Sequence, residues 1–186
     1  CRETRTGNYL STSVCVPNDY TCSTDDQSGD EDAAGGAEVR VQELLADPPT
    51  DMAGDVNGDG VRDARDDEYV ELTNTGDEAA DISGWALADN VTTRFRFPAD
   101  TLLAPGDTLV VFGGGEPASF SGLEGANVLV ADGLYLNNSG DTLTVVDHNG
   151  EEIDRVAYGS EGGRDRALVR DGDGWSLAEG VGTPGE

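Results

Sequence analysis

The twelve-residue segment Asp55–Asp66 contains oxygen-bearing side chains at the spacing of a calcium-binding loop. These side chains stand at loop positions 1, 3, 5, 9 and 12, and they are Asp55, Asn57, Asp59, Asp63 and Asp66. Gly60 at position 6 permits a sharp bend, and the backbone carbonyl of Val61 serves as position 7. Calcium is a hard cation that takes about six to eight oxygens at flexible geometry. The spacing therefore predicts that this loop binds calcium.

The loop departs from the helix–loop–helix calcium motif in two respects. At position 12 Asp66 replaces the bidentate glutamate, although Asp67 and Glu68 follow at once and can assist. The preceding Ala46–Pro49 contains two prolines and cannot lie inside a helix, whereas Glu68–Thr73 alternates like a strand. We therefore expect the loop to join two strands. The alternative is a solvated acidic turn without metal, because Asp, Asn and Gly are the usual turn residues.

Net charge narrows the range of partners. The 186 residues include 11 basic and 38 acidic side chains, which gives a net charge of -27, and every basic residue is arginine. So acidic a surface repels phosphate backbones and anionic membranes. We therefore expect no nucleic-acid binding, and we expect calcium, salt water or cationic partners to suit the chain.

The first residue suggests where the protein works. The sequence begins with Cys1 and shows neither an initiator methionine nor a signal peptide, so we expect a processed chain. A mature chain that begins with cysteine resembles a bacterial lipoprotein, whose cysteine carries lipid ahead of a polar tether such as Ser23–Glu38. One expectation is thus a lipid anchor at Cys1 on the outer envelope. The other is that the numbering starts at an arbitrary or differently processed point.

The remaining cysteines predict an oxidising, extracellular setting. Cys15 and Cys22 flank the turn-prone Pro17–Asp19, so an intrachain disulfide between them is expected in an oxidising compartment. Cys1 is then left for modification or for a bond to another subunit. Zinc is disfavoured, because three cysteines and one distant histidine lack the paired spacing of a structural site.

The chain divides into an N-terminal extension, residues 1–37, and a β-rich domain, residues 38–186. The extension contains one β-prone piece, Asn8–Val16, and the hairpin signal Asn149–Gly150 is the clearest turn of the domain. Short strands separated by regular turns indicate a sandwich or barrel, and no helical period is sustained. The predicted strands are Val39–Leu45, Tyr69–Thr73, Trp85–Ala88, Arg94–Phe97, Leu109–Phe112, Val128–Val130, Leu134–Leu136, Leu143–Val146, Ile153–Tyr158 and Ala167–Val169.

Nine ordered motifs carry a family resemblance: Val41–Pro49, Asp67–Asn74, Ile82–Asp89, Phe97-Pro98, Leu103–Gly106, Leu136–Val145, Val156–Gly159, Arg170–Trp175 and Thr183–Gly185. In this order they resemble the lamin-tail domain, an immunoglobulin-like β sandwich of nuclear lamins and of many bacterial secreted and surface proteins. The resemblance implies that residues 38–186 form such an all-β sandwich. Gln42 stands where the pattern usually has asparagine. Bacterial members often carry an Asp/Asn-rich insertion between their first two strands, where this chain has its calcium loop.

Two positions within these motifs have structural interpretations. Trp85 places a large aromatic ring at the start of a strand and is expected to fill the centre of the sandwich. Asn138–Asp141 is expected to form a tight turn in which Gly140 relieves a backbone restraint. We assign binding chemistry to neither.

Catalytic chemistry is not expected. The single histidine, His148, lies in the predicted hairpin turn, and no nucleophile elbow, phosphate loop or zinc-protease helix occurs. Gly113–Gly115 lacks a following helix and a lysine and is interpreted as a plain loop. Paired carboxylates carry little information in so acidic a chain.

Two functional hypotheses remain open. In the first, the chain is a calcium-stabilised extracellular subunit of a cell-surface or filamentous assembly, and Asn8–Val16 adds as a strand to the sheet edge of a neighbour. In the second, it is a lipid-anchored adhesion or substrate-targeting module, and residues 1–37 serve only as a tether.

Overall fold

The computed structural model describes residues 36–116 and 127–185. The chain divides into two units, Cys1–Ala34 and Gly35–Glu186, and the description concerns the second. The three cysteines, the predicted disulfide between Cys15 and Cys22 and the predicted strand Asn8–Val16 lie outside the described residues.

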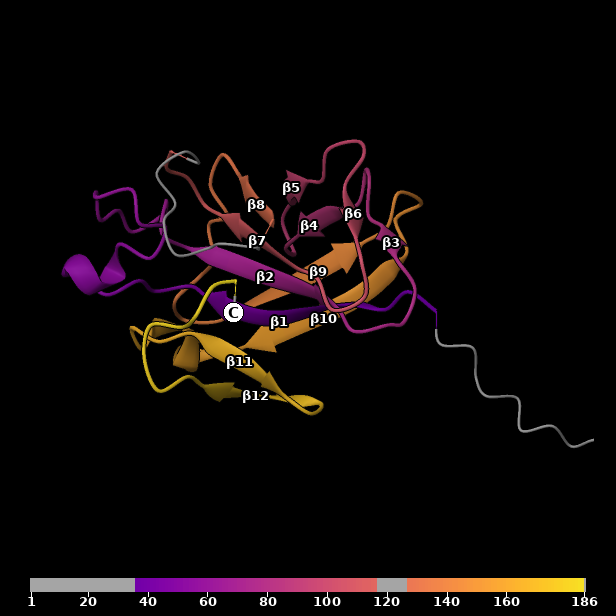
Figure 1. Cartoon of the computed structure of the whole chain (residues 1–186). Helices are drawn as coiled ribbons and strands as arrows, with labels where there is room; N and C mark the ends of the chain where they lie inside the picture. Colours follow the sequence, from indigo (N-terminus) through magenta and orange to yellow (C-terminus); the bar gives the residue numbers. More distant parts are fainter. Residues whose placement is uncertain (1–35, 117–126, 186) are drawn as a thin grey trace, which may run out of the picture. The chain divides into compact units, whose positions relative to one another are not determined.

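The domain consists of two β sheets and a small strand pair (Figure 1). The larger sheet has the order β12 (Gly174–Leu177), β11 (Leu168–Asp171), β1 (Val39–Leu45), β2 (Tyr69–Asn74), β7 (Thr108–Phe112) and β8 (Asn127–Val130). The smaller sheet has the order β10 (Glu152–Tyr158), β9 (Asp141–Val146), β4 (Ala86–Ala88) and β5 (Thr93–Arg96). β3 (Ala80–Asp81) pairs with β6 (Leu102–Leu103). All these pairs are antiparallel except β7 with β8.

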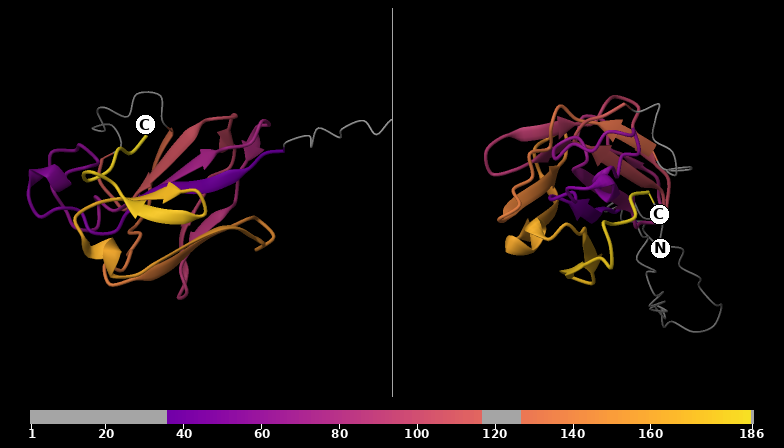
Figure 2. Two further views of the ribbon diagram at one scale, coloured as in Figure 1. Left: turned by 90° about the horizontal axis from the view of Figure 1, so that it is seen from below. Right: turned by 90° about the vertical axis from the view of Figure 1, so that its left-hand side faces the viewer.

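The main core lies between the two sheets, whose layers can be followed in Figure 2. Alternate residues of each strand point into it, as the period of two in a strand requires. Leu72 and Val111 from the larger sheet and Leu143 and Val156 from the smaller sheet are fully buried there. The fold is therefore an all-β immunoglobulin-like sandwich, as the sequence predicts.

A β-bulge in β1 changes which face its side chains occupy. The register of β1 against β2 shifts between Val41 and Glu43, at Gln42. Val41 and Leu44 therefore both face the main core, whereas Glu43 and Leu45 face the outer side of the sheet. Gln42, the position that departs from the family pattern, is thus the extra residue of the bulge.

The outer face of the larger sheet holds a second apolar cluster, Leu45, Tyr69, Val110, Phe112 and Ala167. The C-terminal tail crosses this face: Thr183 N–H donates to Glu43 (2.8 Å) and Gly185 N–H donates to Glu71 (2.7 Å). A Cβ on Gly182, whose φ is +104°, would lie 1.9 Å from the Tyr69 hydroxyl, so only glycine lets the tail approach this closely.

Glu71 makes the stability of the domain depend on pH. Burial raises the pKa of Glu71 to about 7; the bond from the Gly185 N–H lowers this pKa and the charge of Glu43 raises it, each by less than burial does. Its contribution is therefore fully present below pH 4.5, the ordinary pKa, and is lost as pH rises through about 7. The free energy of unfolding of the parent protein minus that of Glu71→Gln should fall by on the order of 2 kcal/mol over this interval, measured by urea unfolding with chelator. Glu179→Gln, at an exposed site in the same tail, serves as control, and a difference that is flat with pH would refute the prediction.

The structure confirms most predicted strands and corrects one. Leu134–Leu136 is not a strand: both leucines are buried as alternation suggests, but Tyr135 has a φ of +55°, which breaks a strand ladder. The hairpin at Asn149–Gly150 is confirmed between β9 and β10. The tight turn is confirmed by the Gly140 N–H bond to Asn137 (3.0 Å) and a Gly140 φ of +129°.

Helical structure is confined to two short 3-10 turns, Met52–Gly54 and Ser160–Gly163, within the described residues. In the same part of the chain, no helix has the length and apolarity needed to cross a bilayer.

Candidate metal centre

The predicted calcium loop connects β1 with β2, two central strands of the larger sheet, and is drawn in purple at the left of Figure 1. A 3-10 turn, Met52–Gly54, leads into it, and Asp51 caps this turn by accepting the Ala53 N–H (3.1 Å). A hydrogen-bonded turn over residues 64–67 lies at the end of the loop. The 3-10 turn before the loop and the turn at its end are each too short to be recognised from sequence periodicity.

Backbone N–H groups of the loop donate to its own ligand side chains. Gly60 N–H donates to Asp55 Oδ2 (3.1 Å), Asp59 N–H to Asn57 Oδ1 (3.0 Å) and Val61 N–H to Asp59 Oδ1 (2.8 Å). These bonds orient the side chains at positions 1, 3 and 5. Each carboxylate retains a second oxygen that the loop's backbone does not engage.

The second oxygen of Asp55 is the most informative atom of the loop. Asp55 Oδ1 is buried and has no hydrogen-bond partner among the described residues. Leaving a buried acceptor unsatisfied costs about 1–3 kcal/mol, more when it is charged, and such atoms in native structures need an explanation. In calcium loops of this spacing, the carboxylate at position 1 coordinates the ion.

Asp63 and Asp66, at loop positions 9 and 12, are linked by the turn over residues 64–67. Asp63 Oδ1 accepts the N–H groups of Arg65 (2.8 Å) and Asp66 (3.2 Å), and these bonds lower the pKa of Asp63. The pKa of Asp66 is raised, first by burial and then by the charges of Asp63 and Asp59. Asp66 at position 12 is therefore near enough to Asp59 and Asp63 to be repelled by both carboxylates.

Asp67 and Glu68 hold the loop against the sandwich. Asp67 is fully buried, and its two oxygens accept N–H groups from Asn57 (3.3 Å) and Asp63 (2.7 Å). Burial nevertheless raises the pKa of Asp67 to about 6. Glu68 accepts the Leu136 N–H (3.1 Å), and burial raises its pKa to about 8. Asp67 thus fastens the loop from within, and Glu68 fastens the segment that leads to β9.

The Gly113–Gly115 segment, for which the sequence predicts a plain loop, packs directly on this centre. Gly113 N–H donates to the Glu68 carbonyl (2.7 Å), Gly114 N–H to the Asp66 carbonyl (3.1 Å), and the Gly114 carbonyl accepts Asn57 Nδ2 (3.4 Å). Added Cβ atoms would lie 1.8 Å from the Arg65 carbonyl at Gly113 and 2.2 Å from Asp66 Oδ1 at Gly114. Three consecutive glycines are the signal for this close approach.

The carboxylates of the loop are not arranged as a preformed metal site. Within residues 36–116 and 127–185, no group of three or more His, Cys, Asp or Glu side chains is placed to hold a metal ion. The predicted donor set also includes the Asn57 amide oxygen and the Val61 carbonyl, which a group of His, Cys, Asp and Glu side chains does not contain. The loop supplies suitable donors in the right order, and they have to draw together to coordinate an ion.

Comparison with known proteins supplies the family. The family model described as Lamin Tail Domain matches residues 32–160, more than half of the chain. The chain belongs to the lamin tail domain family. No curated protein matches it significantly.

The matched range of the lamin tail domain contains the metal loop and the Gly113–Gly115 segment, but it ends before β11 and β12. The family is one of immunoglobulin-like structural and binding domains and is not defined by a catalytic activity. His148 is exposed in the hairpin turn, as predicted. Trp85 differs from the prediction: it is half-buried and packs against the main core without filling its centre, because part of the side chain lines a surface hollow.

Replacing Gly113 by alanine should destabilise this lamin tail domain. Its Cβ would overlap the Arg65 carbonyl, a backbone atom that cannot rotate away, so a loss of about 1–3 kcal/mol in the free energy of unfolding is expected. Gly180→Ala is the matched control, because its Cβ would meet nothing within 4 Å. Urea unfolding measures both variants, and equal stabilities would show that the segment does not press on the loop.

Proposed function

We propose that this lamin tail domain is a non-catalytic, calcium-stabilised structural module that works outside the cell, at the cell surface or in a filamentous assembly. The observation that carries the proposal is the position of the calcium loop between β1 and β2. Both strands are buried on both faces, so the loop's ends are fixed by the two apolar clusters. An ion that closes the loop would therefore stabilise the sandwich as a whole.

Calcium would be held by the side chains of Asp55, Asn57, Asp59, Asp63 and Asp66 and by the Val61 carbonyl, with Asp67 beside them. The ion would neutralise carboxylates that otherwise repel one another and would satisfy Asp55 Oδ1. Val56, inside the loop, packs against the outer apolar cluster, so an ordered loop also protects that cluster. This is a structural role, and it requires no open coordination position for a substrate.

An extracellular site of action suits both the ion and the charge. Extracellular calcium modules bind weakly, with dissociation constants of about 0.1–1 mM, and such sites are filled only where calcium is abundant. The net charge of -27 disfavours contact with nucleic acid or with anionic lipid. A lipid anchor at Cys1 is compatible with this placement and remains part of the proposal.

Self-association through the N-terminal segment is the second part of the proposal. The two main sheets of the described domain end in four edge strands: β12, β8, β10 and β5. An edge strand presents backbone groups to which the β-prone Asn8–Val16 of a second copy could add. Such a contact joins two different surfaces, and a head-to-tail contact that does not close produces a filament.

Deleting residues 1–35 tests the assembly directly. The shortened protein should keep a cooperative unfolding transition, because it retains every strand described in the sandwich, and it should sediment as a monomer. The full chain should form larger species, more so with calcium or high salt, which screen its negative charge. Analytical ultracentrifugation and electron microscopy give the readout. Equal assembly of both proteins would disprove strand addition and would leave the N-terminal segment as a tether.

A binding module remains the alternative function, and one observation favours it. A hollow lined by a half-buried tryptophan and several charged side chains lies at the opposite end of β1 from the calcium loop.

A further inference from the structure

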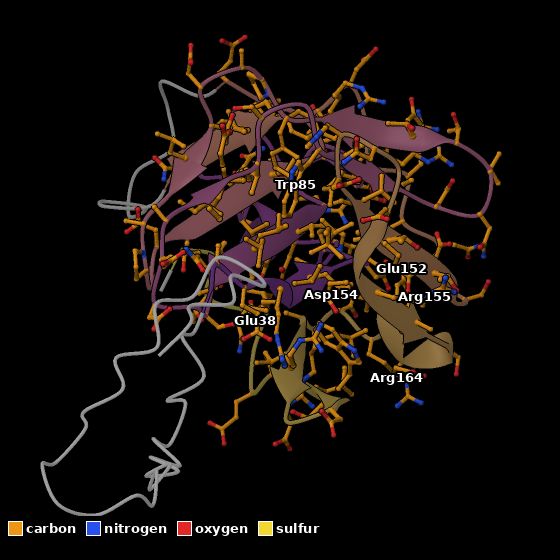
Figure 3. The ribbon with its side chains drawn as sticks, turned by 90° about the vertical axis from the view of Figure 1, so that its right-hand side faces the viewer. Glu38, Trp85, Glu152, Asp154, Arg155 and Arg164 are labelled. Atoms are coloured by element: carbon orange, nitrogen blue, oxygen red, sulfur yellow. The ribbon has the colours of Figure 1, made fainter. Side chains whose placement is uncertain are left out.

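This hollow has a volume of about 590 Å³ and lies where β1 begins, beside β3 and β10. Its lining residues include Trp85, Ile153 and Ala37, with Glu38, Asp81 and Asp154 as the acidic members. Figure 3 shows Trp85 above Glu38 and Asp154 on this side of the domain. The hollow is thus formed by segments distant in sequence that the sandwich brings together.

Trp85 supplies an aromatic surface in this hollow. The indole packs partly against the main core, which fixes it, and lines the hollow with the remainder. Ile153, which also lines the hollow, is 39% exposed and adds an apolar surface. A fixed, partly exposed indole attracts a cation through the negative face of its ring.

The carboxylates are held in place by the domain's own hydrogen bonds. Asp81 accepts the Ser83 N–H (3.0 Å), and Asp154 accepts the Val41 N–H (2.8 Å) and forms an ion pair with Arg170 (2.5 Å). Glu38 is paired with Arg40, the one basic residue of the lining. Hydrogen bonds lower the pKa of Asp81 and of Glu38, so both are ionised at neutral pH.

We propose that this hollow binds a cationic side chain, lysine or arginine, presented by a partner protein. The cation would lie on the indole of Trp85 and between the carboxylates of Glu38 and Asp81. Charge complementarity favours this occupant over a neutral sugar: three carboxylates line the hollow against one guanidinium. Arg40 and Arg170 form ion pairs with Glu38 and Asp154, whereas Asp81 forms no ion pair within the described residues and supplies the uncompensated charge. The net charge of -27 would also speed the approach of a basic partner.

The site is independent of the calcium proposal, because β1 separates the hollow at Val39 from the loop that follows Leu45. Failure of either proposal therefore leaves the other standing. Binding of a basic peptide to the hollow can be measured with calcium present or absent, and its affinity should be the same in both conditions.

The test uses the full chain with Trp175→Phe, so that emission reports on Trp85, and an acetylated tetralysine amide as probe. The peptide should change the emission at low salt and lose most of its affinity at high salt. Glu38→Gln with Asp81→Asn should weaken binding about fivefold, since two exposed charge pairs together contribute about 1 kcal/mol.

Glu179→Gln with Asp132→Asn removes the same charge from exposed positions outside the hollow and should change affinity less than about twofold. Equal weakening in both double variants would mean general attraction to an acidic surface and would overturn the proposal. An unchanged Trp85 emission on addition of the tetralysine peptide would also overturn the proposal. A neutral oligosaccharide that changes the emission while tetralysine does not would identify a glycan site instead.

Discussion

Removing calcium is expected to lower the melting temperature of this lamin tail domain by about 5–10 °C. An ion that binds only the folded state stabilises it by RT ln(1 + [L]/Kd), which is about 2.7 kcal/mol at ~100 times Kd. For a chain of this size each kcal/mol corresponds to about 2–4 °C. The loop links β1 to β2, so the effect should appear in the single cooperative transition of the sandwich and not as local fraying.

Asp55→Asn with Asp59→Asn is the decisive variant for this effect. It keeps an acceptor oxygen for the Gly60 and Val61 N–H groups but removes two charges from the donor set. The variant should melt at the same temperature with and without calcium. Magnesium should substitute poorly in the parent protein, because it demands tighter octahedral geometry. A parent melting temperature that chelator leaves unchanged at moderate salt would contradict the calcium site.

Ending the chain at Ser160, where the family match stops, should abolish stable folding. The shortened chain would lose β11, which pairs with β1 at the centre of the larger sheet. It would also lose the buried Leu168 and the partly buried Trp175 and Leu177 from the main core. At about 1.5–3 kcal/mol for each fully buried apolar side chain, the loss is on the order of 5 kcal/mol, comparable with the whole stability of many domains.

The same truncation removes the tail bonds to Glu43 and Glu71 and leaves these buried carboxylates without their N–H donors. The matched control is the chain that lacks residues 1–35, a longer deletion that should remain folded. Circular dichroism during heating distinguishes the two. A cooperative transition in the chain that ends at Ser160 would show that β11, β12 and the tail are accessory.

Much of the fold could be predicted because strands of this sandwich alternate in hydrophobicity. The predicted strands Tyr69–Thr73 and Leu143–Val146 lie within the observed strands β2 and β9. The two-residue strands β3 and β6 were missed, because pairs this short carry no periodicity. Leu134–Leu136 alternates without being a strand, since the positive φ of Tyr135 is not visible in the pattern.

The candidate metal centre was only partly predictable for a related reason. The ligand spacing is local in sequence, so the donors from Asp55 to Asp66 could be named. The supports are not local: Gly113–Gly115 reaches the loop only because β7 lies beside β2. Three consecutive glycines indicate close packing, but sequence alone does not identify the surface that they approach.

Isothermal titration of calcium into the chelator-treated full chain tests whether the loop binds the ion. We expect one ion per chain, bound with a dissociation constant of about 1 mM or tighter. Asp55→Asn with Asp59→Asn should abolish this binding, whereas Glu179→Gln with Asp132→Asn should leave it unchanged. Absence of binding by the parent chain, or binding that survives the loss of Asp55 and Asp59, would show that the loop is not a calcium site.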